Sequence, residues 1–327
     1  MSVLRRPCRC ATALKWPECE LNRRRSTELR RHVIWRLYVI ASSSYTSRLV
    51  RTTLAAAILL TGAAGTARAQ DDPNPGAITL TTGVDFPSVY FFRGIRQEAD
   101  PKLTMFAFGD VGISLFSNDE GKSVSMNFGV WSSLNTGSSG SGSDIPGKGS
   151  HYEEDFYAML NLGVGRGITI SPFYTAYTSG NGSFGTVKEL AFKFAHASRF
   201  APYGLVAFEL SGQADGGSEE GTYAELGAAP SFPLGGGGAT LGIPVKFGFS
   251  LSDYYEAAGE DNGFGFFDIG ALVTVPFSSD PTKFGTWNLH GGVNFLALGD
   301  GTKSLNVKDG EPEGSQVIVS IGIGMTY

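Results

Sequence analysis

Cysteine is nearly absent from this chain, and none of it lies in the part expected to fold. The three cysteines, Cys8, Cys10 and Cys19, all precede residue 50 of the 327. The remainder therefore has no means of forming a disulfide framework or a thiolate metal site. The three early cysteines also lack paired Cys-x-x-Cys spacing, which makes a zinc site there a weak interpretation.

Basic residues become scarce after residue 69. The chain has 26 Lys and Arg, of which 13 lie before residue 70, and 31 Asp and Glu, of which 3 lie there. Residues 70–327 therefore hold 13 basic and 28 acidic residues, a net charge of −15. A chain with this charge repels nucleic acid. The same part contains no run of 18 apolar residues, which excludes membrane-spanning helices.

The N-terminal region carries an export signal. Residues 54–64 form an apolar run behind Arg51, and Ala67 and Ala69 match the A-x-A cleavage pattern. We expect residues 50–69 to be a secretory signal peptide, cleaved before Gln70. Residues 1–49 fit neither a signal peptide nor a folded domain. A start codon placed too early, with translation from Val50, explains them, and a genuine basic extension is the alternative. Residues 70–327 would be the mature domain.

The chain ends on a strand with one apolar face. Val319, Ile321, Ile323, Met325 and Tyr327 alternate with polar or small residues, which is the period of a β-strand. About twelve such segments follow residue 76, most of them about ten to thirteen residues long, which suits tilted strands that cross a bilayer. They are 77–94, 103–116, 123–134, 155–164, 168–177, 186–196, 202–211, 222–232, 239–251, 264–276, 286–297 and 316–327.

The connections between these segments alternate in length. The gaps 117–122, 165–167, 197–201, 233–238 and 277–285 are short or compact, whereas 135–154, 212–221, 252–263 and 298–315 are longer and rich in acid. Short periplasmic turns and long extracellular loops are typical of outer-membrane barrels. We therefore predict an all-β fold, a closed antiparallel transmembrane β-barrel of about 12 strands (roughly 10–14). Pro172 and Pro244 interrupt two of the strands and indicate bulges or displaced boundaries.

A known family resembles parts of this pattern. Residues 88–97, Ser-Val-Tyr-Phe-Phe-Arg-Gly-Ile-Arg-Gln, resemble the first strand of a proteobacterial porin family with a Phe-Arg-Gly-x-x-Gln signature. Residues 129–133 (Gly-Val-Trp-Ser-Ser), 153–157 (Glu-Glu-Asp-Phe-Tyr) and 252–255 (Ser-Asp-Tyr-Tyr) add later matches, while Arg96 stands where the family usually has Ser. The resemblance implies an outer-membrane barrel of pore type and implies no particular solute.

Charged residues within apolar strands are the candidate pore lining. An unpaired charge on the lipid face costs about 2–4 kcal/mol near the bilayer midplane, so these residues should face the lumen. Arg93 is the foremost candidate, facing Asp110 or Asp155, and a structural ion pair is the alternative. Glu189 and Lys193 share one strand face and are expected to form a lumen pair, with Glu209 and Glu225 nearby. The candidate pore-lining residues are Arg93, Arg96, Asp110, Asn127, Asp155, Glu189, Lys193, Asn288 and His290.

Enzymatic and metal-binding interpretations are weaker. His151, His196 and His290 are too scattered for a metal triad, and no local signature places a nucleophilic serine beside His290. Gly163, Gly165 and Gly167 predict a periplasmic turn, since no helix follows to hold a phosphate. Aromatic residues near strand ends suit interfacial girdles: Tyr90, Phe91, Phe92, Tyr157, Tyr174, Tyr177, Tyr254, Tyr255, Trp287 and Tyr327.

These features favour an outer-membrane channel for passive diffusion of small polar solutes. A closed structural or adhesin-type barrel without conductance is the alternative, because a twelve-stranded lumen lies between filled and wide barrels. We expect no enzymatic activity, no cofactor and no metal. The expected partners are outer-membrane lipid, lipopolysaccharide and the barrel-assembly machinery, the last through the C-terminal strand ending at Tyr327.

Overall fold

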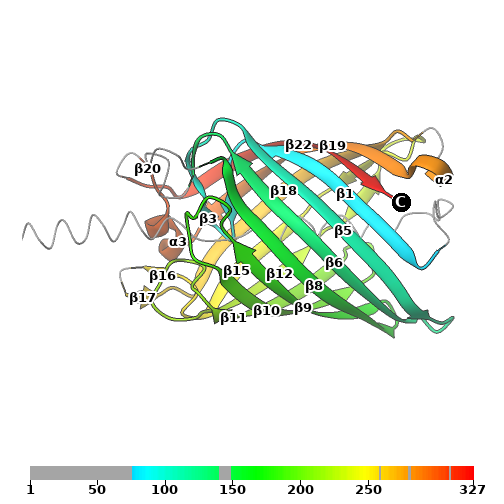
Figure 1. The fold of residues 1–327 in the computed structure, drawn as a ribbon, viewed down its shortest axis with the longest axis horizontal. Helices are drawn as coiled ribbons and strands as arrows, with labels where there is room; N and C mark the ends of the chain where they lie inside the picture. The colour runs from blue at the N-terminus through cyan, green and yellow to red at the C-terminus, as the bar shows by residue number, and fades with distance from the viewer. Residues whose placement is uncertain (1–75, 140–148, 258, 279–280, 309–310) are drawn as a thin grey trace, which may run out of the picture. The chain divides into compact units, whose positions relative to one another are not determined.

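The computed structural model describes residues 76–139, 149–257, 259–278, 281–308 and 311–327. The predicted signal peptide and its cleavage site lie outside these residues. In the described part, a single antiparallel sheet closes on itself as a 12-strand barrel (Figure 1). The wall consists of β1 (Ile78–Pro87), β5 (Thr104–Ser117), β6 (Lys122–Asn135), β8 (His151–Gly165), β9 (Ile168–Thr178), β10 (Val187–His196), β11 (Pro202–Ser211), β12 (Thr222–Ala228), β15 (Val245–Ser252), β18 (Phe264–Pro276), β19 (Thr286–Leu298) and β22 (Ser315–Thr326).

Each wall strand pairs with the next one along the chain, and β22 returns to pair with β1. The last residue takes part in this closure: the Leu80 N–H donates to the Tyr327 carbonyl at 2.6 Å, and the Tyr327 N–H donates back to Leu80 at 2.8 Å. A closed sheet leaves no free edge, so its backbone groups are satisfied without water.

Shorter elements occupy the connections. They are β2 (Phe91–Phe92), β3 (Ile95–Arg96), β4 (Glu98–Asp100), β7 (Ser138–Ser139), β13 (Ser231–Pro233), β14 (Thr240–Gly242), β16 (Glu256–Ala257), β17 (Glu260–Asp261), β20 (Val307–Lys308), β21 (Glu311–Pro312), α2 (Pro281–Phe284) and α3 (Asp300–Leu305). β13 and β14 prolong the hairpin of β12 and β15. No helix among the described residues is long and apolar enough to span a bilayer.

The two ends of the barrel differ. The turn end carries the compact connections, the start of β1 and the end of β22, and the loop end carries β2–β4, β16–β17, β20–β21 and α3 (Figure 1). The predicted tight turn after β8 is present at the turn end, where Gly165, Arg166 and Gly167 all have positive φ. Most connections at the turn end are short, as predicted, but residues 229–244 form a longer one that carries β13 and β14.

Four of the predicted strands differ from the structure. Residues 222–232 and 239–251 were each expected to be one strand, but the first is divided into β12 and β13 and the second into β14 and β15. Residues 77–94 were expected to be one strand, but the wall strand ends at Pro87 and the following residues turn into the barrel. The strand expected at 155–164 begins at His151, because His151 and Glu153 already pair with β6, with a bulge at Tyr152 between them.

Both prolines lie where the ladder is interrupted. Pro172 pairs with Phe192 on β10, but on its other side the recorded pairing with β8 skips from Met159–Phe173 to Leu162–Ile170. Pro244 falls in the gap between β14 and β15. A proline has no N–H to donate, so these breaks are expected.

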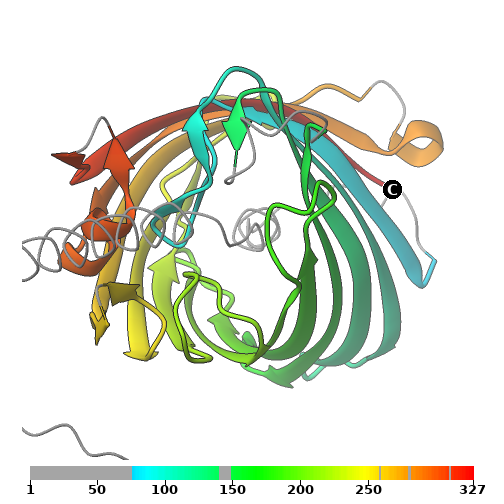
Figure 2. The same cartoon turned by 60° about the vertical axis from the view of Figure 1, so that its left-hand side comes forward.

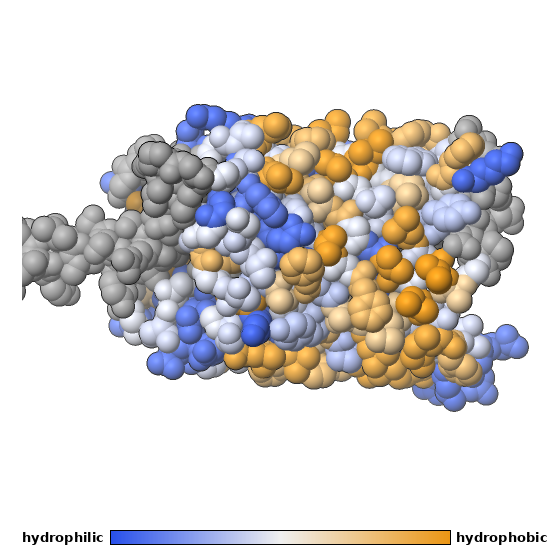
Figure 3. All heavy atoms as spheres, in the orientation of Figure 1, coloured by the Kyte–Doolittle hydropathy of each residue, from blue (hydrophilic) through white to orange (hydrophobic). Residues whose placement is uncertain are grey.

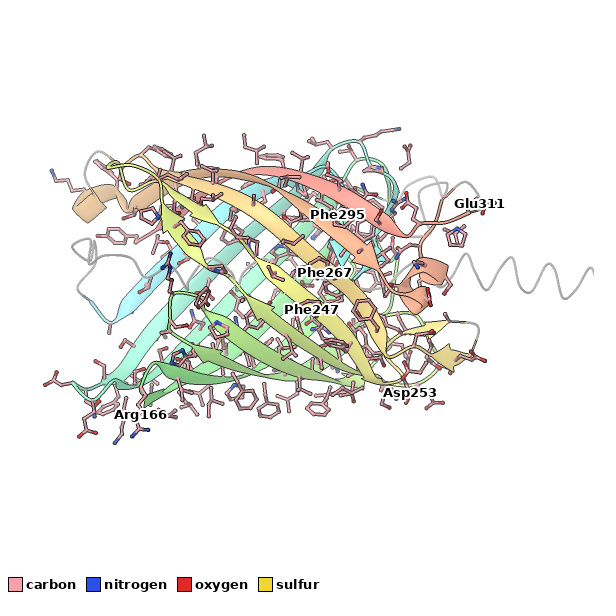
Figure 4. All side chains as sticks on the ribbon, turned by 180° about the vertical axis from the view of Figure 1, so that it is seen from behind. Arg166, Phe247, Asp253, Phe267, Phe295 and Glu311 are labelled. Atoms are coloured by element: carbon pink, nitrogen blue, oxygen red, sulfur yellow. The ribbon has the colours of Figure 1, made fainter. Side chains whose placement is uncertain are left out.

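The outer face of the wall is apolar. Val317, Val319 and Ile321 are each more than half exposed, and Phe247, Phe267 and Phe295 line up across β15, β18 and β19 (Figure 4). Figure 3 shows hydrophobic residues over the barrel wall and hydrophilic residues at its ends. Such a surface would be costly in water and is favourable in hydrocarbon. The chain is thus a transmembrane barrel of the outer-membrane type.

Candidate functional site

The lumen of this barrel is the candidate site, and its first feature is an inward hairpin, residues 88–98. β2 pairs with β3 through Phe91–Arg96 and Phe92–Ile95. The turn residues Arg93 and Gly94 have φ of 43° and 82°, the positive values required by a two-residue type I′ turn. Figure 2 shows the segment after β1 turned inside the ring of strands.

The inward hairpin reaches almost the opposite wall. Arg93 Nη1 and Nη2 donate to the two carboxylate oxygens of Glu189 at 2.7 and 2.9 Å. Glu189 belongs to β10, which is five strands from β1 in one direction and seven in the other. The hairpin therefore crosses the lumen.

Aromatic rings enclose this ion pair. Arg93 also donates to the Tyr254 hydroxyl at 2.8 Å, and its guanidinium carbon lies 4.0 Å from the centroid of Tyr223. The Tyr177 hydroxyl donates to Glu189 at 3.1 Å. The Arg93 and Glu189 side chains are 4% and 1% exposed. A charge pair removed from water to this degree is tolerable only when its partners are well hydrogen-bonded. Here the Arg93 side chain donates three hydrogen bonds and the Glu189 carboxylate accepts three.

Further hydrogen bonds fix the rest of the hairpin. The Tyr90 hydroxyl donates to Glu153 at 2.9 Å, and the Tyr152 hydroxyl donates to Gln97 at 2.8 Å. The Asn306 side chain accepts from the Arg96 N–H and donates to the Gly94 carbonyl, both at 2.6 Å. These contacts bury the hairpin side chains against the barrel interior.

Arg96 points to a different wall from Arg93. Its guanidinium pairs with Glu313 and donates to Gln316 on β22 at 3.0 Å. The Phe91 ring lies 5.3 Å from its Cζ. Two arginines in one short hairpin thus attach it to two separated parts of the barrel.

Away from the hairpin, polar side chains form a row across neighbouring strands. Asn127 donates to Asp110 at 2.6 Å, Asn161 donates to Asn127 at 2.9 Å, and Ser171 donates to Asn161 at 2.7 Å. Tyr157 also donates to Asp110, at 2.6 Å, and its ring lies where a Cβ on Gly129 would stand. Asn127 and Asn161 are only partly buried, so water inside the barrel reaches this row.

A second polar group bridges the closing strands. His290 Nε2 lies 2.6 Å from Asp85 Oδ1, and its Nδ1 lies 2.8 Å from Asn288 Oδ1. Gly322, on the strand between them, leaves the space that this contact needs. Both ring nitrogens are engaged, which leaves neither to activate a serine.

The structure brings together some of the residues predicted from sequence and separates others. Asp110 lies beside Asn127, and Asn288 beside His290, all on the lumen side. Arg93 pairs with Glu189 instead of Asp110 or Asp155, because the hairpin carries it past them. Asp155 faces the interior from β8 and is buried. The expected Glu189–Lys193 pair is wrong: Lys193 instead lies over the Tyr203 ring, 4.7 Å from its centroid.

Several of the expected girdle aromatics belong to the interior. Tyr90, Phe92, Tyr177, Tyr254 and Tyr255 are at most 2% exposed. Tyr177, for example, points into the barrel, as do Phe173 and Thr175 at every second position of β9. Tyr174 and Tyr327 do lie on the outer face, each 38% exposed. Glu153 and Asn306 hold the hairpin, although neither was predicted as its partner from the sequence. Glu153 could have been found from its shared parity with Asp155.

Comparison with known proteins gives matches at the level of three-dimensional structure. No family model matches the chain, and no curated protein matches it. Among solved structures it is similar to the NanC porin, with 11% identity over 75% of this chain and 98% of that one and a TM-score of 0.38. It is also similar to an outer-membrane channel from Pseudomonas putida F1, with 8% identity over 79% of this chain and 98% of that one and a TM-score of 0.46. A third similar structure is outer membrane phospholipase A from Escherichia coli, with 10% identity over 75% of this chain and 89% of that one and a TM-score of 0.39. Such values do not transfer a function, so the function is argued from the lumen itself.

Proposed function

We propose that this chain is an outer-membrane channel through which small polar solutes diffuse passively. The observation that carries the proposal is the lining of the lumen away from the inward hairpin. Asn127, Asn161 and Lys193 point inward in a closed barrel and still retain partial exposure. Polar side chains that contact water inside an apolar-walled barrel are what a diffusion path requires.

The inward hairpin sets the width of this path. Its residues Tyr90, Phe92 and Ile95 are at most 2% exposed, so the hairpin occupies part of the lumen at that level. The same observation favours a second candidate, a structural barrel that does not conduct. Conductance distinguishes the two.

Three further statements belong to the proposal. The chain acts as a channel and not as a hydrolase, which the engagement of both His290 nitrogens supports. The Phe92-Arg93-Gly94 sequence and Gln97 form the functional core of the signature noted in the sequence, because each contributes to the hairpin or its anchorage. Its partners would be outer-membrane lipid, lipopolysaccharide and the assembly machinery that recognises the strand ending at Tyr327.

Planar-bilayer recording of the refolded mature chain tests the proposal. We expect discrete conductance steps, and larger steps when residues 89–97 are replaced by nine Gly and Ser residues, because the crossing segment is then removed while both flanking strands remain. Heat-modifiable migration on gels verifies that each chain has folded. Folded barrels that conduct in neither form would contradict the channel and leave the structural barrel.

A further inference from the structure

The lumen-facing positions of the wall strands carry an excess of carboxylates. Every second residue of a wall strand faces the lumen. At these positions of the described wall strands, the only basic residues are Lys193, Lys246 and His290. The carboxylates at such positions are Asp85, Asp110, Glu153, Asp155, Glu189, Glu209, Glu225 and Asp268. Three of them have a basic partner: Glu189 pairs with Arg93 of the hairpin, Asp268 with Lys246, and Asp85 contacts His290. Fixed charges of one sign along a narrow path raise the local concentration of the opposite ion.

This lining already holds two ammonium groups, which are those of its own lysines. Lys193 Nζ lies 4.7 Å from the centroid of Tyr203, whose hydroxyl donates to Glu225 at 2.5 Å. Lys246 Nζ lies 3.4 Å from an oxygen of Asp268 and 6.0 Å from the Phe266 ring. A carboxylate beside an aromatic face is a favourable environment for an ammonium ion. At Lys246, a lumen carboxylate of the wall thus pairs with an ammonium group.

Asp110 presents the same chemistry without a cation from the chain. It lies near the middle of β5, faces the lumen and is only partly buried. Its carboxylate accepts hydrogen bonds from Asn127 and from Tyr157, and both donors are neutral. Among the ion pairs of the described residues, none reaches Asp110.

We propose that the lumen is selective for cations, ammonium-bearing solutes among them, and that Asp110 is a specificity-determining residue. This inference rests on the proposed channel function. An anion meets carboxylates along the path and finds the basic groups of the lumen already engaged. Arg93 is paired with Glu189, Arg96 with Glu313 and Lys246 with Asp268, and Lys193 lies over the Tyr203 ring. A small cation meets at Asp110 a carboxylate whose charge no basic side chain of the wall offsets.

Reversal potentials across a KCl gradient, repeated with methylammonium chloride, test this inference. The wild-type chain should favour K⁺ and methylammonium over Cl⁻. Asp110→Asn keeps the size of the side chain and removes its charge. It should lower the cation-to-anion permeability ratio by roughly fivefold, the Boltzmann factor for unit charges about 4 Å apart in water. Asp119→Asn, in the exposed turn after β5, is the matched control and should leave the ratio unchanged.

The outcomes separate the inference from the function on which it rests. Conductance that favours Cl⁻, or a ratio that Asp110→Asn leaves unchanged, overturns the inference and retains the channel. The hairpin-replaced chain keeps Asp110 and serves as a second conducting form. If neither form conducts after verified folding, both the channel and its selectivity are overturned.

Discussion

Two side chains illustrate how the interior of this barrel is stabilised. Arg93 and Glu189 are buried together, with two parallel hydrogen bonds between them and tyrosine hydroxyls at their remaining sites. The attraction between such charges is offset in large part by the loss of their hydration, so the pair contributes specificity more than net stability. Removing one partner is a different matter, because the other is then left charged and buried.

Arg93→Met tests this asymmetry. We expect the free energy of unfolding, measured by urea denaturation in detergent, to fall by about 3–5 kcal/mol, the usual cost of a buried charge without its partner. The double variant Arg93→Met with Glu189→Gln should recover part of that loss, since no charge remains stranded.

Lys122→Met is the control for this experiment. Lys122 and Glu120 form an ion pair of similar length, 2.9 Å, but their side chains are 56% and 71% exposed. Its loss should cost less than about 1 kcal/mol. An equal effect of the two methionine variants would contradict the role given to burial.

A glycine determines the contact between Asp85 and His290. A Cβ on Gly322 would collide with the Asp85 carboxylate and with His290 Nε2. Gly322→Ala should therefore lower the free energy of unfolding by about 1–3 kcal/mol through overpacking. Gly109→Ala, in the middle of β5 with open space around the added carbon, should be close to neutral by the same measurement. A neutral Gly322→Ala would show that the pair is not held together as described.

At the scale of elements, the loop 212–221 packs against residue 256 through buried acid. Asp215 accepts hydrogen bonds from the N–H of Gly217 and of Glu256, both at 2.7 Å. Burial nevertheless raises the pKa of Asp215 from 3.8 to about 7, and the two backbone hydrogen bonds oppose this shift without cancelling it. An acid whose pKa is higher in the folded state binds its proton more tightly there than in the unfolded chain.

The stability of this loop should consequently depend on pH. It should be greatest below about pH 4 and should decline as the pH rises through about 7, because ionised Asp215 is disfavoured where it is buried. Hydrogen exchange of the Gly217 and Glu256 amides, corrected for intrinsic rates, measures this decline. Asp215→Asn should flatten the profile, whereas protection that increases with pH in the wild type would contradict the assignment.

The wall elements could be predicted from the sequence, whereas the inward hairpin could not. Alternation such as Phe247, Phe249 and Leu251 reports the lipid face directly, because that face must be apolar along the whole strand. The hairpin follows β1 with equally apolar residues, Tyr90 to Phe92, so periodicity does not show where the wall ends. Its only local signal is Gly94 after Arg93, a weak turn pair.

The residues that contact the hairpin could not be predicted from the sequence, because their positions depend on how the barrel closes. Arg93 and Glu189 are 96 residues apart, and they meet because the sheet closes with a given strand number and register. Parity shows that Glu189 faces inward, but parity alone does not indicate which inward residue lies opposite. Asp110 and Asn127 were easier, since they belong to adjacent strands.

At the scale of the whole molecule, Tyr327 extends the seam between β1 and β22 that closes the barrel. Tyr327 exchanges two backbone hydrogen bonds with Leu80 beyond the last pair of the β1–β22 ladder. Deleting Tyr327 should therefore reduce the amount of heat-modifiable barrel in the outer membrane severalfold. Tyr327→Phe keeps the backbone and the ring, and it should insert nearly as well as the wild type. Equal insertion of the deleted and intact chains would remove the proposed assembly role.

The hairpin that crosses the lumen also constrains the order of events during biogenesis. It is made near the beginning of the barrel sequence, yet it contacts Tyr254 and Asn306, 161 and 210 residues further along. Contacts of such long sequence separation form late, after the chain between them has been organised. We therefore expect an assembly intermediate in which the lumen does not yet contain the docked hairpin. In it, Arg93 and Arg96 remain hydrated until the later strands and loops that carry their partners have formed.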